Sequence, residues 1–293
     1  MVDLKCLIIG YGLLGKELAV KMQEKGIEFS VASNDINEAL GNRVDITSKE
    51  EAGSLLLQHK PDVVFLTAAV TNVDFCEENS QRAFDVNVSG AKNVAGACEE
   101  HGCFLVFYST DFVFDGKKGN YSETDLPNPL NVYGKTKLEA EQAIAEAVQR
   151  CLIIRTSTLY GQFEPVENTA EKKKSFVQWV FDSLKAGNEI MVVTDQVTNP
   201  TLVDELAEAS IALVGKKAKG LIHVAGRTAL SRFQFAEKVA ERFSLNKALI
   251  KPIETAQLGQ AAKRPKDSSL SLKKLNSLGV KTKDIESALK ELA

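Results

Sequence analysis

The sequence of 293 residues contains few of the residues that build metal centres and disulfide frameworks. Its three histidines, His59, His101 and His223, are too few and too far apart for a histidine-based metal site. Its five cysteines show no Cys-x-x-Cys spacing, and an odd, unpatterned set of thiols is typical of a reducing compartment. We therefore expect no metal, and cysteines that act mostly as small buried side chains.

Long hydrophobic runs and an excess of charge of one sign are also missing. No segment approaches the about 18 consecutive apolar residues of a membrane-spanning helix, and the first apolar run, at residues 6–9, is too short for a signal peptide. The formal net charge of −3 gives no reason to expect nucleic acid or an anionic membrane as a partner. These absences predict a soluble, cytoplasmic protein without nucleic-acid or membrane partners.

Short β-branched apolar runs alternate with longer segments whose apolar residues follow helical spacing. We expect strands at residues 4–10, 27–33, 62–69, 103–109 and 151–157. We expect helices at residues 13–26, 48–60, 80–101 and 131–150. Strict alternation of this kind favours a parallel sheet with right-handed crossovers. The sequence therefore predicts an α/β fold with a doubly wound parallel sheet of the Rossmann type.

The alternation stops after about Thr156, where the second part of the chain begins. We interpret the charged residues 161–174 as a surface loop, and residues 175–187 as an amphipathic helix that buries Trp179 in the core. We predict a Rossmann domain at 1–155, with a later strand near 219–225 that returns to the sheet. We expect residues 156–293 to form a smaller, mainly helical region whose main role is to bind the substrate.

A glycine-rich turn directly follows the first expected strand and opens the first expected helix. It reads Gly10-Tyr11-Gly12-Leu13-Leu14-Gly15. Glycines at these positions allow a tight turn, a close approach of backbone N–H groups to a pyrophosphate, and close packing of helix on strand. The turn predicts a dinucleotide site formed by Gly10, Gly12, Leu13, Leu14 and Gly15.

The residues after the second and third expected strands bear on the choice of dinucleotide. Asp35 lies about 20 residues beyond the last glycine, where an acid binds the ribose hydroxyls of NAD and an arginine favours NADP. No basic residue follows Asp35 before Arg43, which favours NADH slightly over NADPH. The alternative interpretation is that Asp35 is only part of a turn and binds no cofactor. Asp45 and Ile46 follow a short third strand, at a position where adenine could bind.

Tyr133 and Lys137 lie one helical turn apart at the start of the expected helix 131–150. A lysine held near a phenol stabilises the phenolate, which makes tyrosine a usable general acid or base. Thr110, followed by Asp111, ends the strand before this helix, where a hydroxyl can hold a substrate carbonyl or simply cap a turn. Together with the glycine turn, these residues describe a reductase in which Tyr133 delivers a proton as nicotinamide delivers hydride.

Several longer segments resemble the extended short-chain dehydrogenase/reductase superfamily, and more closely the dTDP-4-dehydrorhamnose reductase family. The similar segments are residues 60–77, 87–102, 107–141, 194–201 and 263–270. The resemblance implies an enzyme that uses NADH or NADPH on a nucleotide-sugar substrate, and homodimers are common in this superfamily. It implies Thr110, Tyr133 and Lys137 as catalytic residues, with Ala68, Ala69 and Lys137 at the cofactor. It implies Thr110, Asp111, Tyr133, Thr158 and Arg264 at the substrate.

The sequence departs from that family at three places. The glycine turn is one residue shorter than the usual Gly-x-x-Gly-x-x-Gly, Thr158 replaces a common tryptophan, and Val70 replaces a frequent histidine. The charged stretch after Gly161 and the tail at 261–270 are also similar to the regulatory β subunit of methionine adenosyltransferase, which keeps Tyr-x-x-x-Lys but serves as a binding partner. A catalytically silent nucleotide-binding subunit is therefore the alternative hypothesis, and a reductase of an unrelated small carbonyl compound is a third.

Overall fold

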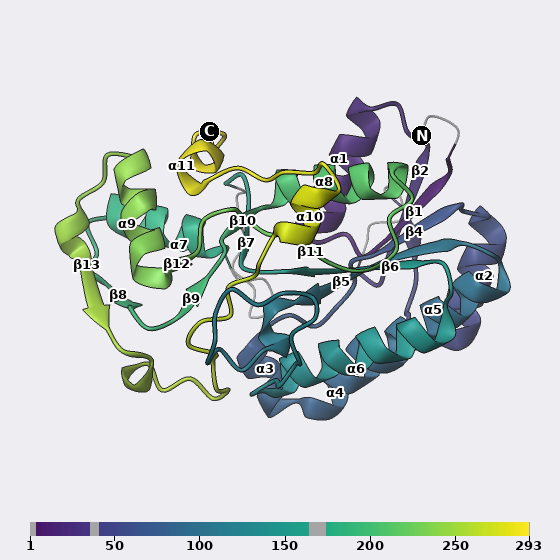
Figure 1. The fold of residues 1–293 in the computed structure, drawn as a ribbon, viewed down its shortest axis with the longest axis horizontal. Helices are drawn as coiled ribbons and strands as arrows, with labels where there is room; N and C mark the ends of the chain where they lie inside the picture. Colours follow the sequence, from purple (N-terminus) through teal and green to yellow (C-terminus); the bar gives the residue numbers. More distant parts are fainter. Residues whose placement is uncertain (1–3, 36–40, 164–173, 293) are drawn as a thin grey trace.

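The computed structural model describes residues 4–35, 41–163 and 174–292. Within these residues, seven strands form one parallel sheet in the order β11-β6-β5-β4-β1-β2-β3 (Figure 1). They are β1 (Cys6–Ile9), β2 (Phe29–Ser33), β3 (Asn42–Arg43), β4 (Val63–Leu66), β5 (Phe104–Thr110), β6 (Cys151–Thr156) and β11 (Gly220–His223). The order runs outward in both directions from β1 and β4, which confirms the predicted doubly wound fold.

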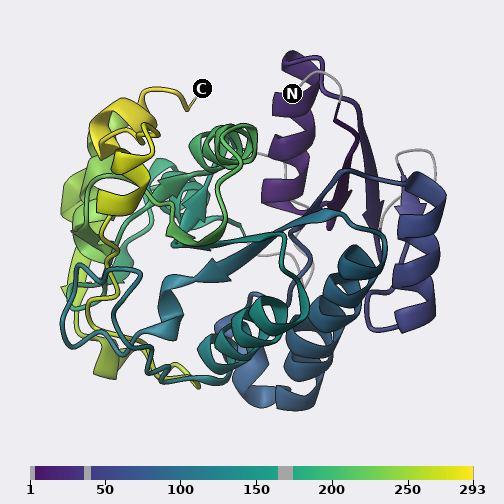
Figure 2. The ribbon, with the colours of Figure 1, turned by 45° about the vertical axis from the view of Figure 1, so that its right-hand side comes forward.

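Helices cover both faces of this sheet (Figure 2). One face packs against α1 (Leu13–Glu24), α8 (Val203–Gly215) and α10 (Lys273–Ser277), and the other against α2 (Lys49–His59), α5 (Ala91–Glu100) and α6 (Val132–Ala147). Side chains alternate along each strand, so Cys6 and Ile8 of β1 enter the first layer while Leu7 and Ile9 enter the second. This burial on both faces explains why the strands are continuous apolar runs.

The expected helix at 80–101 is present but contains an irregular turn. It consists of α4 (Ser80–Phe84), a π-helical turn η1 (Asp85–Gly90) and α5, and it follows the short helix α3 (Val73–Glu78). Gly90 lies against the side chain of Ile46, where an added Cβ would be 2.7 Å from Cγ1. Turns of this kind occur frequently beside functional sites.

The C-terminal region begins where β6 ends and has a hydrophobic core of its own. Its helices are α7 (Phe176–Lys185), α9 (Arg232–Arg242) and α11 (Ile285–Leu289). Its short strands pair as β7 (Leu159–Tyr160) with β10 (Thr201–Leu202), β8 (Ile190–Val193) with β13 (Ile250–Ile253), and β9 (Val197–Thr198) with β12 (Leu230–Ser231). One-turn 3-10 helices are η2 (Asp111–Val113), η3 (Lys247–Leu249) and η4 (Thr255–Gln257). Figure 1 shows this region beside the sheet, with α9, β13 and β8 farthest from the N-terminus.

Some expectations for the second half need correction or lie beyond the described residues. The prediction that Trp179 is buried is wrong, because its side chain is 37% exposed. The buried stripe of α7 consists of Val177, Val180 and Leu184, and Trp179 falls beside that stripe. Most of the loop expected at 161–174, including Lys172 and Lys173, lies outside the described residues, and Lys174 pairs with Asp182 at 2.7 Å. The division into domains at 155 stays a prediction.

No helix in residues 4–35, 41–163 and 174–292 is both long enough and apolar enough to cross a bilayer.

Candidate active site

The glycine turn joins β1 to α1 at the centre of the sheet. Gly10 has φ +105°, and a Cβ there would lie 2.5 Å from the backbone nitrogen of Ala68. A Cβ on Gly15 would lie 2.0 Å from the carbonyl oxygen of Gly10, so both positions require glycine. A Cβ on Gly12 would meet nothing within 4 Å, and no side chain of the described residues caps α1 there. The first N–H groups of α1 are therefore left to a ligand such as a pyrophosphate.

The segment after β4 lies directly against this turn. The Thr67 hydroxyl donates to the Gly10 carbonyl at 2.9 Å, and the Ala68 N–H donates to the Ile9 carbonyl at 2.9 Å. Ala68 and Ala69 therefore lie beside the glycine turn. The predicted cofactor residues from the ends of β1 and β4 are brought together in this way.

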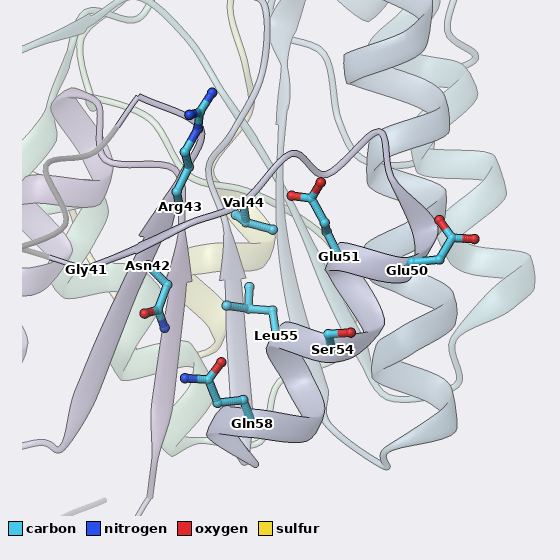
Figure 3. Close-up of a pocket in the computed structure, with 9 residues that line it drawn as sticks. All are labelled: Gly41, Asn42, Arg43, Val44, Glu50, Glu51, Ser54, Leu55 and Gln58. Atoms are coloured by element: carbon cyan, nitrogen blue, oxygen red, sulfur yellow. The ribbon is translucent and has the colours of Figure 1, made fainter.

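An acid and an arginine lie side by side where β2 and β3 end. Asp35 accepts a hydrogen bond from the Ser33 hydroxyl at 2.9 Å, and Ser33 is the register partner of Arg43 on β3. Both Asp35 and Arg43 are exposed. Figure 3 shows Arg43 at the rim of a surface pocket between β3 and α2. The sequence favoured NADH because Arg43 is distant along the chain, but pairing of β2 with β3 makes it a neighbour of Asp35.

The turn that contains Asp45 and Ile46 is held by several hydrogen bonds. The Asp45 carboxylate accepts from the N–H and hydroxyl of Thr47 at 2.9 and 2.7 Å, which lower the pKa of that carboxyl. The Asn93 amide donates to the carbonyl groups of Ile46 and Thr47, each at 3.0 Å. The turn is therefore fixed beside the end of β3, and its contact with adenine stays a prediction.

Tyr133 is the second residue of α6 and lies against the end of β5. Asn131 caps the helix by accepting from the Gly134 N–H at 2.8 Å. A Cβ on Gly134 would be 2.2 Å from the Phe112 carbonyl oxygen, so glycine allows α6 to contact η2 closely. Burial raises the pKa of Tyr133 well above its usual value, and the nearby Thr110 hydroxyl opposes the shift. The predicted catalytic residues Thr110 and Tyr133 therefore lie close together.

Lys137 is buried one turn further along α6. Its Nζ lies 4.1 Å from the centroid of the Phe107 ring. Burial lowers the pKa of Lys137 to about 7, and the carboxylate of Glu141 opposes that shift. The expectation that Lys137 lowers the pKa of Tyr133 is not met in this structure, because burial has the larger effect on both groups.

Behind Lys137, Glu141 forms a buried ion pair that was not expected from the sequence. Its two carboxylate oxygens accept from Nε and Nη2 of Arg155 on β6, at 2.9 and 2.6 Å. The Arg155 guanidinium lies 5.0 Å from the Phe114 ring centroid. Two signals were available in the sequence: Glu141 is four residues after Lys137, and Arg155 interrupts an apolar strand.

Asp111 connects the end of β5 to the C-terminal region. One carboxylate oxygen accepts from the Thr110 hydroxyl at 3.1 Å, and the other accepts from Thr198 at 3.2 Å and from Ser268. Burial raises the pKa of Asp111 to about 6, although these three hydroxyl groups oppose it. Thr158 has φ +30°, and its hydroxyl lies 3.5 Å from that of Thr198. Thr198 and Ser268 were not singled out from the sequence.

Arg264 lies near the start of α6 because two acids of α3 form contacts there. Asp74 accepts from Arg264 Nη2 at 2.9 Å and from the Ala262 N–H at 3.1 Å. Glu77 accepts from the Val132 N–H at 2.9 Å, at the first residue of α6. The carboxylates of these two acids therefore bind an arginine and a helix N-terminus.

A buried asparagine in the π-helical turn links the cofactor side to α6. Asn87 accepts from the Val70 N–H at 2.8 Å, and its amide donates to the Val70 carbonyl at 3.0 Å and to the Thr136 hydroxyl at 3.1 Å. It therefore holds the segment that follows Ala68 and Ala69 against the helix that carries Tyr133. Asn87 was not predicted from the sequence. The only indication there was that it begins the segment 87–102, which resembles the reductase family.

Comparison with known proteins extends over almost the whole chain. A family model described as the RmlD substrate binding domain matches residues 4–293. The dTDP-4-dehydrorhamnose reductase of Aggregatibacter actinomycetemcomitans is 34% identical, with 96% of this chain and 95% of that protein covered. The methionine adenosyltransferase 2 subunit beta of Rattus norvegicus is 30% identical, with 92% and 80% covered. The crystal structure of dTDP-4-dehydrorhamnose reductase from Bacillus anthracis in complex with NADP has a TM-score of 0.89 and 30% identity, covering 99% of this chain and 98% of that one.

Proposed function

The chain belongs to the family described as the RmlD substrate binding domain, and on that premise we propose that it is an NAD(P)H-dependent reductase. Its substrate would be a 4-keto deoxysugar nucleotide of the dTDP-4-dehydrorhamnose type. The observation that carries the proposal is that Tyr133 and Thr110 lie close together beside buried Lys137, next to a glycine turn that suits a dinucleotide. Relatives named dTDP-4-dehydrorhamnose reductase support the same substrate class.

The proposed roles follow from the chemistry of each side chain. The nicotinamide, when bound, supplies hydride to the carbonyl carbon. Thr110, whose hydroxyl donates to Asp111 in the structure, would turn that proton to the carbonyl oxygen of the substrate. Tyr133, which its raised pKa keeps protonated at neutral pH, donates the proton to that oxygen. Lys137 would bind the ribose of the cofactor.

The proposed cofactor site uses residues from three strand ends. Gly10, Gly12 and Gly15, with the N–H groups of Leu13 and Leu14, would bind the pyrophosphate. Ala68 and Ala69 would line the other side, and Asp45 and Ile46 would contact adenine. Asp35 suits the ribose hydroxyls of NAD, whereas the neighbouring Arg43 suits the extra phosphate of NADP, so the proposal keeps both cofactors.

Oxidation of NADH and of NADPH with dTDP-4-dehydro-6-deoxy-L-mannose tests the proposal. We expect turnover in the wild type and a loss of kcat of about 10²- to 10⁴-fold in Tyr133→Phe, because the general acid is gone. Cofactor affinity should change little, since the phenyl ring is retained. Tyr160→Phe is the matched control, because its hydroxyl is buried without a partner among the described residues, so that variant should keep full activity.

A second candidate function is a nucleotide-binding regulatory subunit. It is favoured by the match to methionine adenosyltransferase 2 subunit beta, and by Thr158 at the position where the reductases commonly carry tryptophan. Tight binding of NADPH without oxidation of either cofactor would contradict the reductase and favour this candidate. Equal turnover in the wild type and in Tyr133→Phe would contradict the assigned proton donor. A homodimer stays a prediction from the superfamily.

A further inference from the structure

Arg232 projects from the start of α9 on a backbone that is firmly fixed. Ser231 and Gln234 form a capping box: the Gln234 N–H donates to the Ser231 hydroxyl oxygen at 3.1 Å, and the Ser231 N–H donates to Oε1 of Gln234 at 2.9 Å. The Arg232 N–H donates to the Gln196 carbonyl at 3.0 Å. The guanidinium carbon lies 5.1 Å from the centroid of the Phe176 ring. Stacking on that ring holds the planar guanidinium in one orientation.

The guanidinium of Arg232 is half-buried and has no ion-pair partner in the part of the chain that the structure describes. Among residues 4–35, 41–163 and 174–292, the other arginines that are not exposed are Arg155 and Arg264, and each has a carboxylate partner within 3 Å. Arg232 has neither an ion pair nor a side-chain hydrogen bond in these ranges. A partly desolvated cation without a partner is costly, so this position is suited to an anionic ligand.

The charges around Arg232 belong to the candidate active site. Burial lowers the pKa of Arg232, the carboxylate of Asp111 opposes that shift, and the positive charge of Arg264 adds to it. Asp111 also acts on Tyr133, whose pKa it raises. Arg232 and Tyr133 therefore both feel the charge of Asp111, whose carboxylate is already bonded to Thr110, Thr198 and Ser268. The pairing of β12 with β9 gives the geometric link, because Leu230, two residues before Arg232, is the register partner of Thr198. The unpaired cation is within electrostatic reach of the site where the carbonyl would react.

We infer that Arg232 binds the diphosphate of the substrate, an inference that rests on the proposed nucleotide-sugar reductase. In a nucleoside-diphosphate sugar the anionic group is joined to the sugar ring itself, so a cation that binds it lies about one ring away from the reacting carbonyl. A guanidinium can bind two phosphate oxygens at once, which a free keto sugar does not offer. Arg232 is therefore a specificity-determining residue for sugars attached to a nucleoside diphosphate.

Phe176 adds a second feature that favours an anion. It is the first residue of α7, a helix of ten residues, so the Arg232 guanidinium stacks at the positive end of that helix. Ser175 caps the helix by accepting from the Gln178 N–H at 3.3 Å. The positive end of the helix therefore adds to the positive potential beside the guanidinium, and this favours an anion at the same place.

Calorimetric titration of the NADP-saturated protein with dTDP, and separately with UDP, tests this role without turnover. We compare the wild type with Arg232→Gln, Arg232→Lys and a control, Lys238→Gln. Lys238 is on the same helix and pairs with Glu286 at 2.9 Å on the surface. We expect Arg232→Gln to lower the affinity for whichever nucleotide binds the wild type more tightly by about 10- to 100-fold, as the loss of a charge-assisted pair does. Arg232→Lys should be intermediate, and the control should bind within about twofold of the wild type.

The dependence of dTDP affinity on salt separates binding from a merely structural role. Arg232→Gln should flatten that dependence, whereas a variant that is only less stable should keep the wild-type slope. Wild-type affinity in Arg232→Gln, or no binding of either nucleotide by the wild type, overturns the inference. If dTDP binding depends on Arg232 but the protein oxidises neither NADH nor NADPH, the diphosphate site stands and the proposed reductase does not. Failure of the inference and failure of the proposed function are therefore distinguishable.

Discussion

Burial sets the protonation of the two residues at the centre of the candidate site. It raises the pKa of Tyr133, so the phenol is protonated at neutral pH, as a proton donor in a reduction must be. It lowers the pKa of Lys137 to about 7, against the attraction of Glu141. Glu141 is itself shared with Arg155, so its carboxylate only partly offsets the cost of burying the ammonium group.

The pKa of Lys137 leads to a pH dependence of stability in the protein without cofactor. This pKa is about 7 in the folded chain, against 10.5 for a lysine in an unfolded, solvated chain. Below pH 7 both states are protonated, and the folded state carries the full cost of the buried charge. Between pH 7 and 10.5 the unfolded state binds more protons, so the free energy of unfolding rises with pH, by at most about 1.4 kcal/mol per unit.

Urea unfolding of wild type and Lys137→Met from about pH 6 to about pH 9.5 measures this effect. Methionine fills similar space without the charge, so its profile lacks the Lys137 contribution. We expect the wild type to gain roughly 2 kcal/mol relative to the variant between about pH 7 and about pH 9. Parallel profiles would mean that Lys137 keeps its ordinary pKa in the folded protein.

At the scale of elements, the first turn of α6 positions Tyr133. Asn131 caps this turn and also donates to the Lys263 carbonyl at 2.8 Å, and Glu77 accepts from the Val132 N–H. Gly134 removes the side chain that would keep α6 away from η2. Residues of α3 and of the C-terminal region therefore bond to the start of α6, directly before Tyr133.

Asn131→Ala should lower both stability and kcat. Loss of the cap costs about 1 kcal/mol, and the buried partners left without bonds add to that. Ser48→Ala, which removes the cap of α2 at the Glu51 N–H, is the control because α2 carries no proposed catalytic residue. We expect both variants to lose stability in urea unfolding, Asn131→Ala the more, with a fall of kcat only in Asn131→Ala. Unchanged kcat in both variants would show that the cap does not position Tyr133.

At the scale of the whole molecule, distant segments of the chain meet around Asp111 and Asp74. The Arg264–Asp74 pair joins residues 190 positions apart, and Arg264 is 9% exposed in its side chain. Ser268 and Asp111 are 157 positions apart. These contacts attach the C-terminal region to the end of the sheet that carries Thr110.

A double-mutant cycle on Asp74 and Arg264 measures this attachment. Asp74→Asn leaves a buried guanidinium without its carboxylate, so we expect a loss of about 1–3 kcal/mol in the free energy of unfolding. The double variant with Arg264→Gln should lose clearly less than the sum of the single losses. The same cycle on the surface pair Lys238 and Glu286 should give a coupling below about 1 kcal/mol. Additive losses at Asp74 and Arg264 would contradict the attachment.

Features that depend on neighbours in the sequence were predicted well. The alternation of strands and helices gave the doubly wound sheet, and helical spacing put Tyr133 and Lys137 on one face of α6. The burial of Trp179 was predicted wrongly, because periodicity shows that α7 has an apolar face but not where that face ends. The π-helical turn at Asn87 was missed, because its stabilising bonds come from Val70 and Thr136.

The sequence by itself determined the fold class, the glycine turn and the spacing of the candidate catalytic pair, because backbone conformation and helical period are local properties. Only the tertiary structure decided the partners: Arg43 beside Asp35, Glu141 with Arg155, and Asp111 with Ser268. It also left Arg232 without a partner among the described residues, a property that no local pattern encodes. Which charges meet depends on how strands and loops far apart in the chain pack, and burial then sets their protonation.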